Sequence, residues 1–234
     1  MKVVILAGGR GRRLLEETRD KPKPMVTIAG RPLLWHIVKH YLHHGFDDFV
    51  IAGGYRGEVI RDYFERNPLD CRVQVVDTGL DTAVGGRVRR LLPLLGDTTF
   101  MMTWGDAVAD VDLKALLSFH RSHGRKATVT AVHPPPRFGR LFLHGQAVTG
   151  FSEKKPDSSE WINGAYFVLE PSVADHIRGD ADQWEDEPMR QLIRNGELMA
   201  YRHEGFWQCV DTLHERELLE ALWLSGTPPW RIWT

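Results

Sequence analysis

Short runs of apolar and β-branched residues alternate along the chain with segments whose apolar residues recur at helical spacing. The first run covers residues 2–7, and within residues 32–44 the side chains of Leu34, Ile37 and Tyr41 mark one face of a predicted helix. The alternation continues to residue 132, with strands predicted at 48–52, 72–76, 99–104 and 127–132 and helices at 57–64, 86–95 and 112–123. This β-α-β order predicts an α/β fold with a mostly parallel sheet that helices cover on both faces.

After residue 132 the pattern changes to strand-like pieces at 140–143, 147–153 and 161–169, which we interpret as hairpins appended to the first sheet. Two helices, a strand and a last helix follow, at 171–177, 188–195, 198–203 and 213–224. The sequence has no internal repeat and no low-complexity linker. We therefore expect one domain over residues 1–234, with a core at 1–132 and an added part at 133–234.

The composition is that of an ordinary globular protein, with 42% hydrophobic and 26% charged residues in a chain of 234. Thirty basic side chains stand against 31 acidic ones, so no overall charge attracts nucleic acid or an anionic membrane, and we expect neither as a partner. Cys71 and Cys209 lie far apart, which argues against a disulfide scaffold or a zinc site and favours a cytoplasmic setting. No segment has the length of a membrane span or the pattern of a signal peptide.

A glycine-rich segment, from Leu6 through Gly8, Gly9 and Gly11, leaves the first predicted strand. Backbone N–H groups of such a loop can surround phosphate oxygens, although a plain strand-to-helix turn would also contain glycine. Two other nucleotide-binding loops fit poorly. A P-loop requires Lys and then Ser or Thr after its second conserved glycine, where this chain has Arg12; the dinucleotide fingerprint requires a third glycine and a later acidic residue.

Two lysines, Lys21 and Lys23, lie in the segment Lys-Pro-Lys-Pro-Met that ends at Met25. The prolines prevent a regular helix and favour an extended backbone, which can direct an ammonium group toward the glycine loop. The alternative is that both lysines are simply solvated surface charges.

Further motifs follow in a fixed order: Gly85-Gly86-Arg87, Gly105-Asp106, Val108-Ala109-Asp110, Glu153-Lys154, Ile162-Asn163-Gly164, and Gly205-Phe206-Trp207-Gln208 with Asp211-Thr212. Together with the glycine loop and the lysine segment, this series resembles the sugar-1-phosphate nucleotidyltransferases, most closely their glucose-1-phosphate cytidylyltransferase branch. The resemblance spans nearly the whole chain. It implies a Rossmann-like mixed, mostly parallel sheet with a small appended β region, and the condensation of a nucleoside triphosphate with a sugar 1-phosphate.

The resemblance also implies roles for individual residues. The triphosphate would lie along Leu6, Ala7, Gly8, Gly9, Gly11 and Arg12, while Arg13 and Lys23 would act in catalysis by neutralising phosphate charge. Asp106 and Asp211 would hold Mg²⁺, although each aspartate alone could equally be a turn or cap residue. The base would meet Gly54, Thr82, Gly85 and Gly86, and the acceptor would meet Glu153, Lys154, Asn163 and Gly164. Glu153 and Lys154 could otherwise be an exposed surface pair.

The implied partners are therefore a nucleoside triphosphate, with CTP favoured, and a sugar 1-phosphate, with glucose 1-phosphate favoured. Another base, a modified sugar or a cyclitol phosphate remains open, as do a non-catalytic nucleotide-sugar-binding subunit and, less in keeping with the loop, a nicotinamide-dependent enzyme. Relatives usually have threonine at the position of Arg12 and a longer segment than residues 65–75, and Lys155 could supplement Lys154. These departures leave base and sugar open.

Histidines and tryptophans recur outside these motifs. His36, His40, His43 and His44 fall on one predicted helix without a carboxylate or cysteine at ligand spacing, so we expect a helix surface or a subunit contact there and not a metal site. The tail contains Trp223, Trp230 and Trp233, which we expect to pack in a subunit interface or against the core. A homo-oligomer is the expected assembly.

Overall fold

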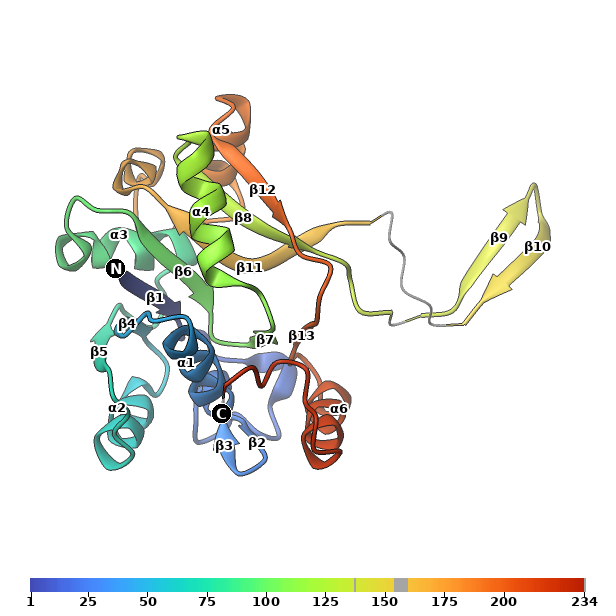
Figure 1. Cartoon of the computed structure of the whole chain (residues 1–234), viewed down its shortest axis with the longest axis horizontal. Coiled ribbons are helices and arrows are strands. Elements are labelled where there is room, and N and C mark those ends of the chain that lie inside the picture. The colour runs from blue at the N-terminus through green and yellow to red at the C-terminus, as the bar shows by residue number, and fades with distance from the viewer. Residues whose placement is uncertain (137, 154–159, 234) are drawn as a thin grey trace.

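The computed structural model describes residues 1–136, 138–153 and 160–233. Its centre is a seven-stranded sheet in the order β12-β8-β11-β6-β1-β4-β5 (Figure 1). All neighbouring pairs are parallel except those of β11, which runs antiparallel to both β6 and β8. The strands are β1 (Lys2–Leu6), β4 (Asp48–Gly53), β5 (Arg72–Asp77), β6 (Phe100–Trp104), β8 (Ala127–Val132), β11 (Ile162–Leu169) and β12 (Leu198–Arg202).

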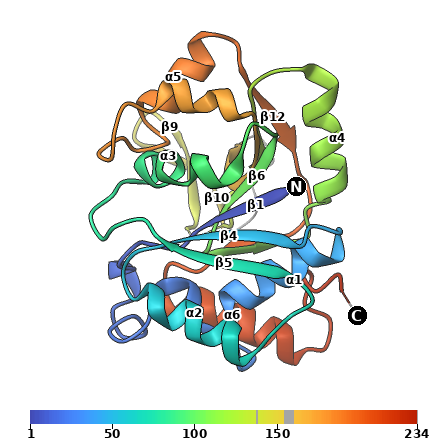
Figure 2. The same ribbon diagram turned by 90° about the vertical axis from the view of Figure 1, so that its left-hand side faces the viewer.

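Helices cover both faces of this sheet, as the alternating pattern predicts. Successive residues of β1 show why: Val3 and Ile5 join one buried cluster, while Val4 and Leu6 point to the opposite face and join another. Figure 2 shows α3 and α5 on one side of the sheet and α1, α2 and α6 on the other. The helices are α1 (Leu33–His43), α2 (Gly57–Arg66), α3 (Val84–Leu95), α4 (Leu113–His123), α5 (Glu187–Arg194) and α6 (Leu213–Leu224), with a 3-10 helix η3 (Pro171–His176) beside α3 and α5.

Three small antiparallel pairs stand outside the main sheet, so the predicted fold with its appended β region is confirmed. They are β2 (Thr27–Ile28) with β3 (Arg31–Pro32), β7 (Ala107–Ala109) with β13 (Trp207–Cys209), and β9 (Arg140–His144) with β10 (Ala147–Ser152). The β9–β10 hairpin extends away from the body of the molecule (Figure 1).

The segment at 161–169 differs from its prediction as an appended hairpin. It forms β11, which lies between β6 and β8 inside the main sheet. The reason is its run of apolar residues, since Tyr166, Phe167, Val168 and Leu169 are fully buried and fill both faces, as a central strand requires. Strands from both halves of the chain therefore share one sheet.

Two of the histidines on α1 contradict the expectation of a surface or subunit contact. His36 and His40 are buried, and their Nε2 atoms lie 3.0 Å and 2.8 Å from the backbone oxygens of Ile28 and Val111. Burial lowers the pKa of His36 to about 4 and that of His40 to about 3. Both histidines are therefore neutral core residues, stabilised by backbone carbonyl groups that the sequence pattern does not reveal.

The tryptophan-rich tail packs against the core of its own chain, one of the two predicted arrangements. Trp230 is 1% exposed and Trp233 is 7% exposed. The ring of Trp230 stacks on Phe206 at 5.7 Å between centroids, and its Nε1 donates to Nδ1 of His36 at 3.4 Å. The tail thus covers α1 and the segment before β13. No helix in the described part of the chain is long and apolar enough to span a membrane.

Candidate active site

Four charged residues from distant parts of the sequence meet near the ends of β6 and β13. The ammonium group of Lys23 lies 2.7 Å from Oδ2 of Asp106 and 2.6 Å from Oδ1 of Asp211. Arg13 donates to the other oxygen of Asp211 at 2.7 Å. Lys23 and Asp211 are only 8% and 9% exposed, so the ion pair between them is largely shielded from water. The side chain of Arg13 is 72% exposed and reaches Asp211 from the solvent side.

Short local elements position each member of this cluster. Asp106 follows β6 in a tight turn in which the N–H of Gly105 donates to the carbonyl of Leu6 at 3.0 Å. A Cβ atom on Gly105 would lie 2.7 Å from Cγ of Pro24, so glycine permits this close approach to the lysine segment. Lys23 begins a 3-10 helix, η2 (Lys23–Met25). The prolines around it therefore support a buried, directed lysine and not a solvated one.

Asp211 is fixed by the start of α6. Thr212 and Glu215 form a capping box, in which Oε2 of Glu215 accepts from the N–H of Asp211 at 2.6 Å and from that of Thr212 at 3.0 Å. Cys209, Asp211 and Glu215 also bring potential metal ligands within 4.8 Å of one another. Because Glu215 already caps the helix, Asp106 and Asp211 are the better carboxylate pair for a cation.

The pair β7–β13 brings the two aspartates together across the sequence. Val108 pairs with Gln208, and the N–H of Val210 donates to the carbonyl of Asp106 at 2.8 Å. Oδ1 of Asp110 accepts from the N–H of Phe206 at 2.7 Å and lies 2.9 Å from Nε2 of His203. Pairing of these short strands was not predicted, because strands of three residues carry too little periodic signal.

The electrostatic balance keeps Lys23 charged. Burial lowers the pKa of Lys23, but the carboxylates of Asp106 and Asp211 raise it by more, so the pKa lies above its ordinary value. Both carboxylates converge on the single point that the ammonium group occupies. Two carboxylates facing one point are a donor set suited to a hard divalent cation, which takes oxygen ligands.

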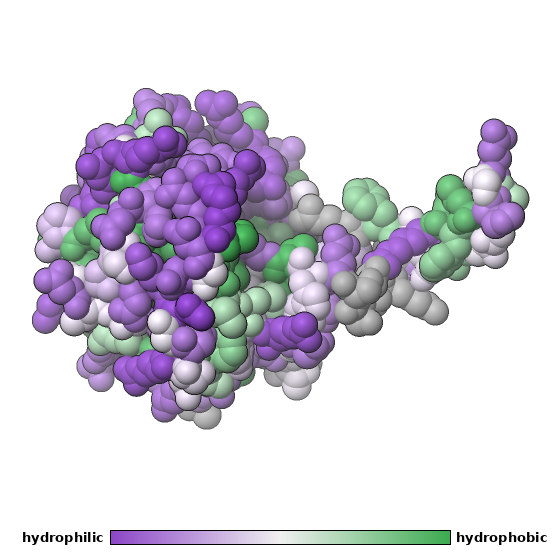
Figure 3. Space-filling model, turned by 90° about the horizontal axis from the view of Figure 1, so that it is seen from above, coloured by the Kyte–Doolittle hydropathy of each residue, from purple (hydrophilic) through white to green (hydrophobic). Residues whose placement is uncertain are grey.

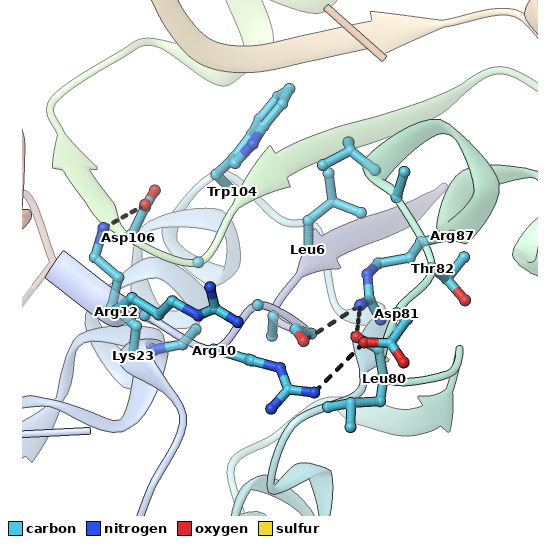
Figure 4. A pocket seen from close by; sticks show the side chains of 18 of the residues that line it. Leu6, Arg10, Arg12, Lys23, Leu80, Asp81, Thr82, Arg87, Trp104 and Asp106 are labelled. Atoms are coloured by element: carbon cyan, nitrogen blue, oxygen red, sulfur yellow. Dashed lines mark hydrogen bonds and ion pairs between the residues drawn. The ribbon is translucent and has the colours of Figure 1, made fainter. Parts of the chain in front are cut away.

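A cavity of about 520 Å³ opens beside this cluster, and most of the predicted nucleotide-site residues line it (Figure 4). Those at the wall are Leu6, Ala7, Gly8, Gly9, Gly11, Arg12, Arg13, Lys23, Thr82 and Asp106. Gly11 has a φ of +59°, a left-handed conformation that favours glycine, and a Cβ atom there would lie 2.9 Å from Cβ of Lys23. The structure therefore brings the glycine loop and the lysine segment to one site.

Arg87 organises the walls of this cavity, a role that the sequence analysis did not assign. Its buried guanidinium donates to the backbone oxygens of Gly53 at 2.9 Å and of Gly8 and Leu80 at 3.3 Å each, and to Oγ1 of Thr78 at 2.6 Å. A Cβ atom on Gly8 would lie 2.1 Å from Nη1 of Arg87. One side chain thus joins three loops, and the glycine at position 8 leaves room for it.

Gly54, Gly85 and Gly86 lie behind the cavity wall and are not among the residues that line it. Added Cβ atoms would lie 2.7 Å from the Gly8 carbonyl oxygen at position 54, 2.7 Å from the Asp182 carbonyl oxygen at position 85, and 2.6 Å from Asp180 Cα at position 86. Their small size lets the glycine loop and the start of α3 pack closely against neighbouring backbone.

A second cavity, also of about 520 Å³, lies on the other side of Asp211. It is lined by Pro134, Pro135, Pro136, Phe138, Arg140, Glu160, Ile162, Trp207, Cys209 and Asp211. The two cavities therefore meet at the charged cluster, because Asp211 lines the second while its ion-pair partners Arg13 and Lys23 line the first.

Two of the predicted acceptor residues, Asn163 and Gly164, lie next to the second cavity without being among its lining residues. Asn163 and Gly164 follow Ile162 on β11, and the carbonyl of Gly164 accepts from Nε1 of Trp207 at 2.8 Å. Glu153 is exposed and follows β10. Lys154 and Lys155 lie outside the described residues.

Comparison with known proteins assigns the family. The model of the nucleotidyl transferase family matches residues 2–215. The chain belongs to this family. Over an alignment of 256 positions covering all of both proteins, it is 47% identical to a glucose-1-phosphate cytidylyltransferase of Salmonella typhimurium. A probable glucose-1-phosphate cytidylyltransferase of Bacillus subtilis is 38% identical, again over the whole of both proteins. The resemblance predicted from the ordered motifs is therefore confirmed.

Solved structures support the same fold. HddC from Yersinia pseudotuberculosis, complexed with GMP-PN, has a TM-score of 0.76 with 20% identity, covering 95% of this chain and 99% of that one. A UDP-glucose pyrophosphorylase has a TM-score of 0.75 with 17% identity, covering 96% of this chain and 98% of that one. At these identities the likeness concerns the architecture alone.

Proposed function

We propose that this nucleotidyltransferase joins CTP and glucose 1-phosphate to give CDP-glucose and pyrophosphate. The observation that carries the proposal is the meeting of two cavities at Lys23, Asp106 and Asp211. A nucleotide in the first cavity and a sugar phosphate in the second would touch at these charges. The choice of CTP and glucose 1-phosphate follows the names of the relatives that are 47% and 38% identical.

The reaction requires no side-chain base. An oxygen of the sugar phosphate attacks the α-phosphorus of the triphosphate, and the bond between that phosphorus and the bridging oxygen to the β-phosphate breaks. The attacking phosphate is already ionised near neutral pH because its second pKa is about 6. Catalysis then consists of alignment and charge stabilisation, which Arg13 and Lys23 provide with a guanidinium and an ammonium group.

The carboxylates of Asp106 and Asp211 fit a magnesium ion, whose protein ligands are usually one or two carboxylates. Held there, Mg²⁺ would supply charge neutralisation at the phosphate oxygens. Asp106→Asn and Asp211→Asn should each lower Mg²⁺ affinity and turnover while leaving the far-ultraviolet circular dichroism unchanged. Unaltered turnover in both variants would remove the metal assignment. A non-catalytic subunit is disfavoured because the described residues retain both carboxylates and both cations in one cluster.

The decisive assay is pyrophosphate release from a matrix of nucleoside triphosphates and sugar 1-phosphates with Mg²⁺. We expect the highest kcat/KM for CTP with glucose 1-phosphate. Faster turnover with another base, a modified sugar or a cyclitol phosphate would replace the substrate assignment but keep the reaction. Absence of pyrophosphate release from every pair would contradict the reaction itself.

We also propose a homo-oligomer in which the β9–β10 hairpin contacts a second copy of the chain. Leu141, Phe142, Leu143, Val148 and Phe151 are each more than half exposed on this hairpin (Figure 3). A two-stranded hairpin is marginally stable alone in water, whereas three or more strands with an apolar face are stable. Two hairpins pairing through a twofold axis would meet that requirement, because each strand has an open edge.

Light scattering tests this assembly. Replacing Phe142 and Leu143 together by serine should lower the mass in solution, whereas Leu224→Ser, at a residue 77% exposed on α6, should not. A monomeric mass for the native protein would refute the proposal. The setting that we propose is cytoplasmic, in keeping with Cys71 and Cys209, neither of which forms a disulfide within the described residues.

A further inference from the structure

The cations that line the first cavity are nearly all committed to partners. Five basic side chains lie at its wall: Arg10, Arg12, Arg13, Lys23 and Arg87. Arg13 and Lys23 pair with the aspartates of the charged cluster, and the guanidinium of Arg87 is taken up by four oxygen atoms. These three side chains bring their positive charge to oxygen atoms of the protein itself.

Arg10 is committed as well, although more weakly. It lies 3.4 Å from Asp81 on the opposite edge of the cavity, and the side chain of Asp81 is 87% exposed. Such an exposed pair contributes little to stability, and Figure 4 shows it directing the Arg10 guanidinium toward Asp81.

Arg12 is different. Within the described residues it makes no hydrogen bond, ion pair or ring contact, although its side chain lines the cavity. Figure 4 shows the Arg12 side chain directed into the cavity, between the Lys23–Asp106 pair on one side and Arg10 on the other. A guanidinium group carries a full charge and a planar set of N–H donors that matches phosphate oxygens. Its natural partner is therefore an anion that enters this cavity.

We propose that Arg12 binds the outer phosphates of the nucleoside triphosphate, those that leave as pyrophosphate; this rests on the proposed function. The transferred phosphate must lie where the two cavities meet, at Lys23, Asp106 and Asp211. A guanidinium directed into the first cavity faces the part of the triphosphate that points away from the acceptor. Arg12 thereby acts on the donor alone and contributes nothing to binding the sugar phosphate.

The test compares Arg12→Met, Arg12→Lys and the control Arg66→Met by calorimetric titration with CTP, CMP and inorganic tripolyphosphate. Arg66 is an exposed arginine on α2 outside both cavities, and its loss removes the same charge. We expect Arg12→Met to weaken CTP and tripolyphosphate about tenfold, the effect of losing one charge-assisted contact of about 1.4 kcal/mol. CMP affinity should change less than about twofold. Arg12→Lys should fall between native and Arg12→Met, and Arg66→Met should match the native protein.

Native-like CTP and tripolyphosphate affinity in Arg12→Met would overturn the inference, as would an equal loss of CMP affinity. The tripolyphosphate titration separates this inference from the proposed function, since it involves neither base nor sugar. If the native protein releases no pyrophosphate but loses tripolyphosphate binding on Arg12→Met, the reaction is wrong and the anion site stands. If native protein binds neither CTP nor tripolyphosphate, both are wrong.

Discussion

Arg87→Met should destabilise the protein by removing the buried group that joins three loops. The change deletes four hydrogen bonds, to Gly8, Gly53, Thr78 and Leu80, from a side chain that is 5% exposed. Two of the abandoned oxygens keep other donors: the carbonyl of Gly53 accepts from the N–H and the Oγ1 of Thr78 at 3.0 Å and 2.6 Å, and the carbonyl of Gly8 accepts from the N–H of Tyr55 at 3.2 Å.

The expected loss is therefore below the sum of four bonds. A hydrogen bond to a charged group contributes about 1.5–3 kcal/mol, and because two acceptors remain satisfied we expect a total of about 2–4 kcal/mol. At roughly 2–4 °C per kcal/mol for a chain of this size, Tm should fall by about 4–16 °C. Arg87→Lys should recover part of this, because an ammonium group keeps the charge but not the fork of donors.

Urea unfolding provides the measurement, with an unchanged m-value as the condition for interpreting the midpoint as stability. Arg89→Met is the matched control: Arg89 lies two residues further along α3, is exposed, and within the described residues donates only to the backbone oxygen of Arg178. We expect its effect to stay within about 0.5 kcal/mol. An Arg87→Met midpoint equal to the native one, or an Arg89→Met loss of the same size, would refute the reasoning.

Three further predictions concern the core and the support of the site. The pKa of His36 is lowered to about 4 in the folded protein, so this histidine makes stability fall by about 3 kcal/mol as pH decreases from 6.5 to 4, where the unfolded chain binds the extra proton. His40, with a pKa of about 3, adds to the same fall. His36→Gln should therefore reduce the slope of stability against pH in urea titrations without removing it, and an unchanged slope would contradict the assigned cause. Trp230→Ala removes a 1% exposed ring and should cost about 3–5 kcal/mol in thermal or urea unfolding, whereas loss of less than 1 kcal/mol would mean that the tail detaches readily. Asp110→Ala removes the acceptor of the Phe206 N–H and should disturb the segment that carries Asp211, so we expect a lower kcat and a lower Mg²⁺ affinity. Native values of both quantities would exclude this positioning role.

Periodicity was enough to predict most of the sheet and its helices. Strands such as 127–132 and helices such as 213–224 were placed with the observed bounds, since their apolar residues face a single core. The segment at 161–169 was misplaced because a run of apolar residues is compatible with a strand of a hairpin and with a central strand of a sheet. His36 and His40 were misjudged because their partners are carbonyl oxygens of Ile28 and Val111, which no sequence pattern encodes.

The site was predicted as a set of residues but not as a geometry. Resemblance supplied Lys23, Asp106 and Asp211, and their distances of 2.6–2.7 Å then follow from the fold. The structural role of Arg87 was not predicted, because nothing in the motif distinguishes an arginine that binds a ligand from one that binds backbone oxygens. Gly85 and Gly86 have a visible structural reason, the close packing of α3 on residues 180–182, and contact with the base stays a prediction for them.

The short β7–β13 pair also bears on the order in which the molecule folds. Lys23 and Asp211 are separated by 188 residues in sequence, and Asp211 lies beside Asp106 only when β13 has paired with β7. The pair β7–β13 has only three residues in each strand and closes a long loop, so we expect it to form after the longer strand pairs of the central sheet. We therefore expect the sheet core around β1 to resist hydrogen exchange more strongly than the N–H of Val210. During synthesis, a chain that ends before residue 211 would contain the glycine loop and Asp106 but would lack Asp211, so its charged cluster would be incomplete.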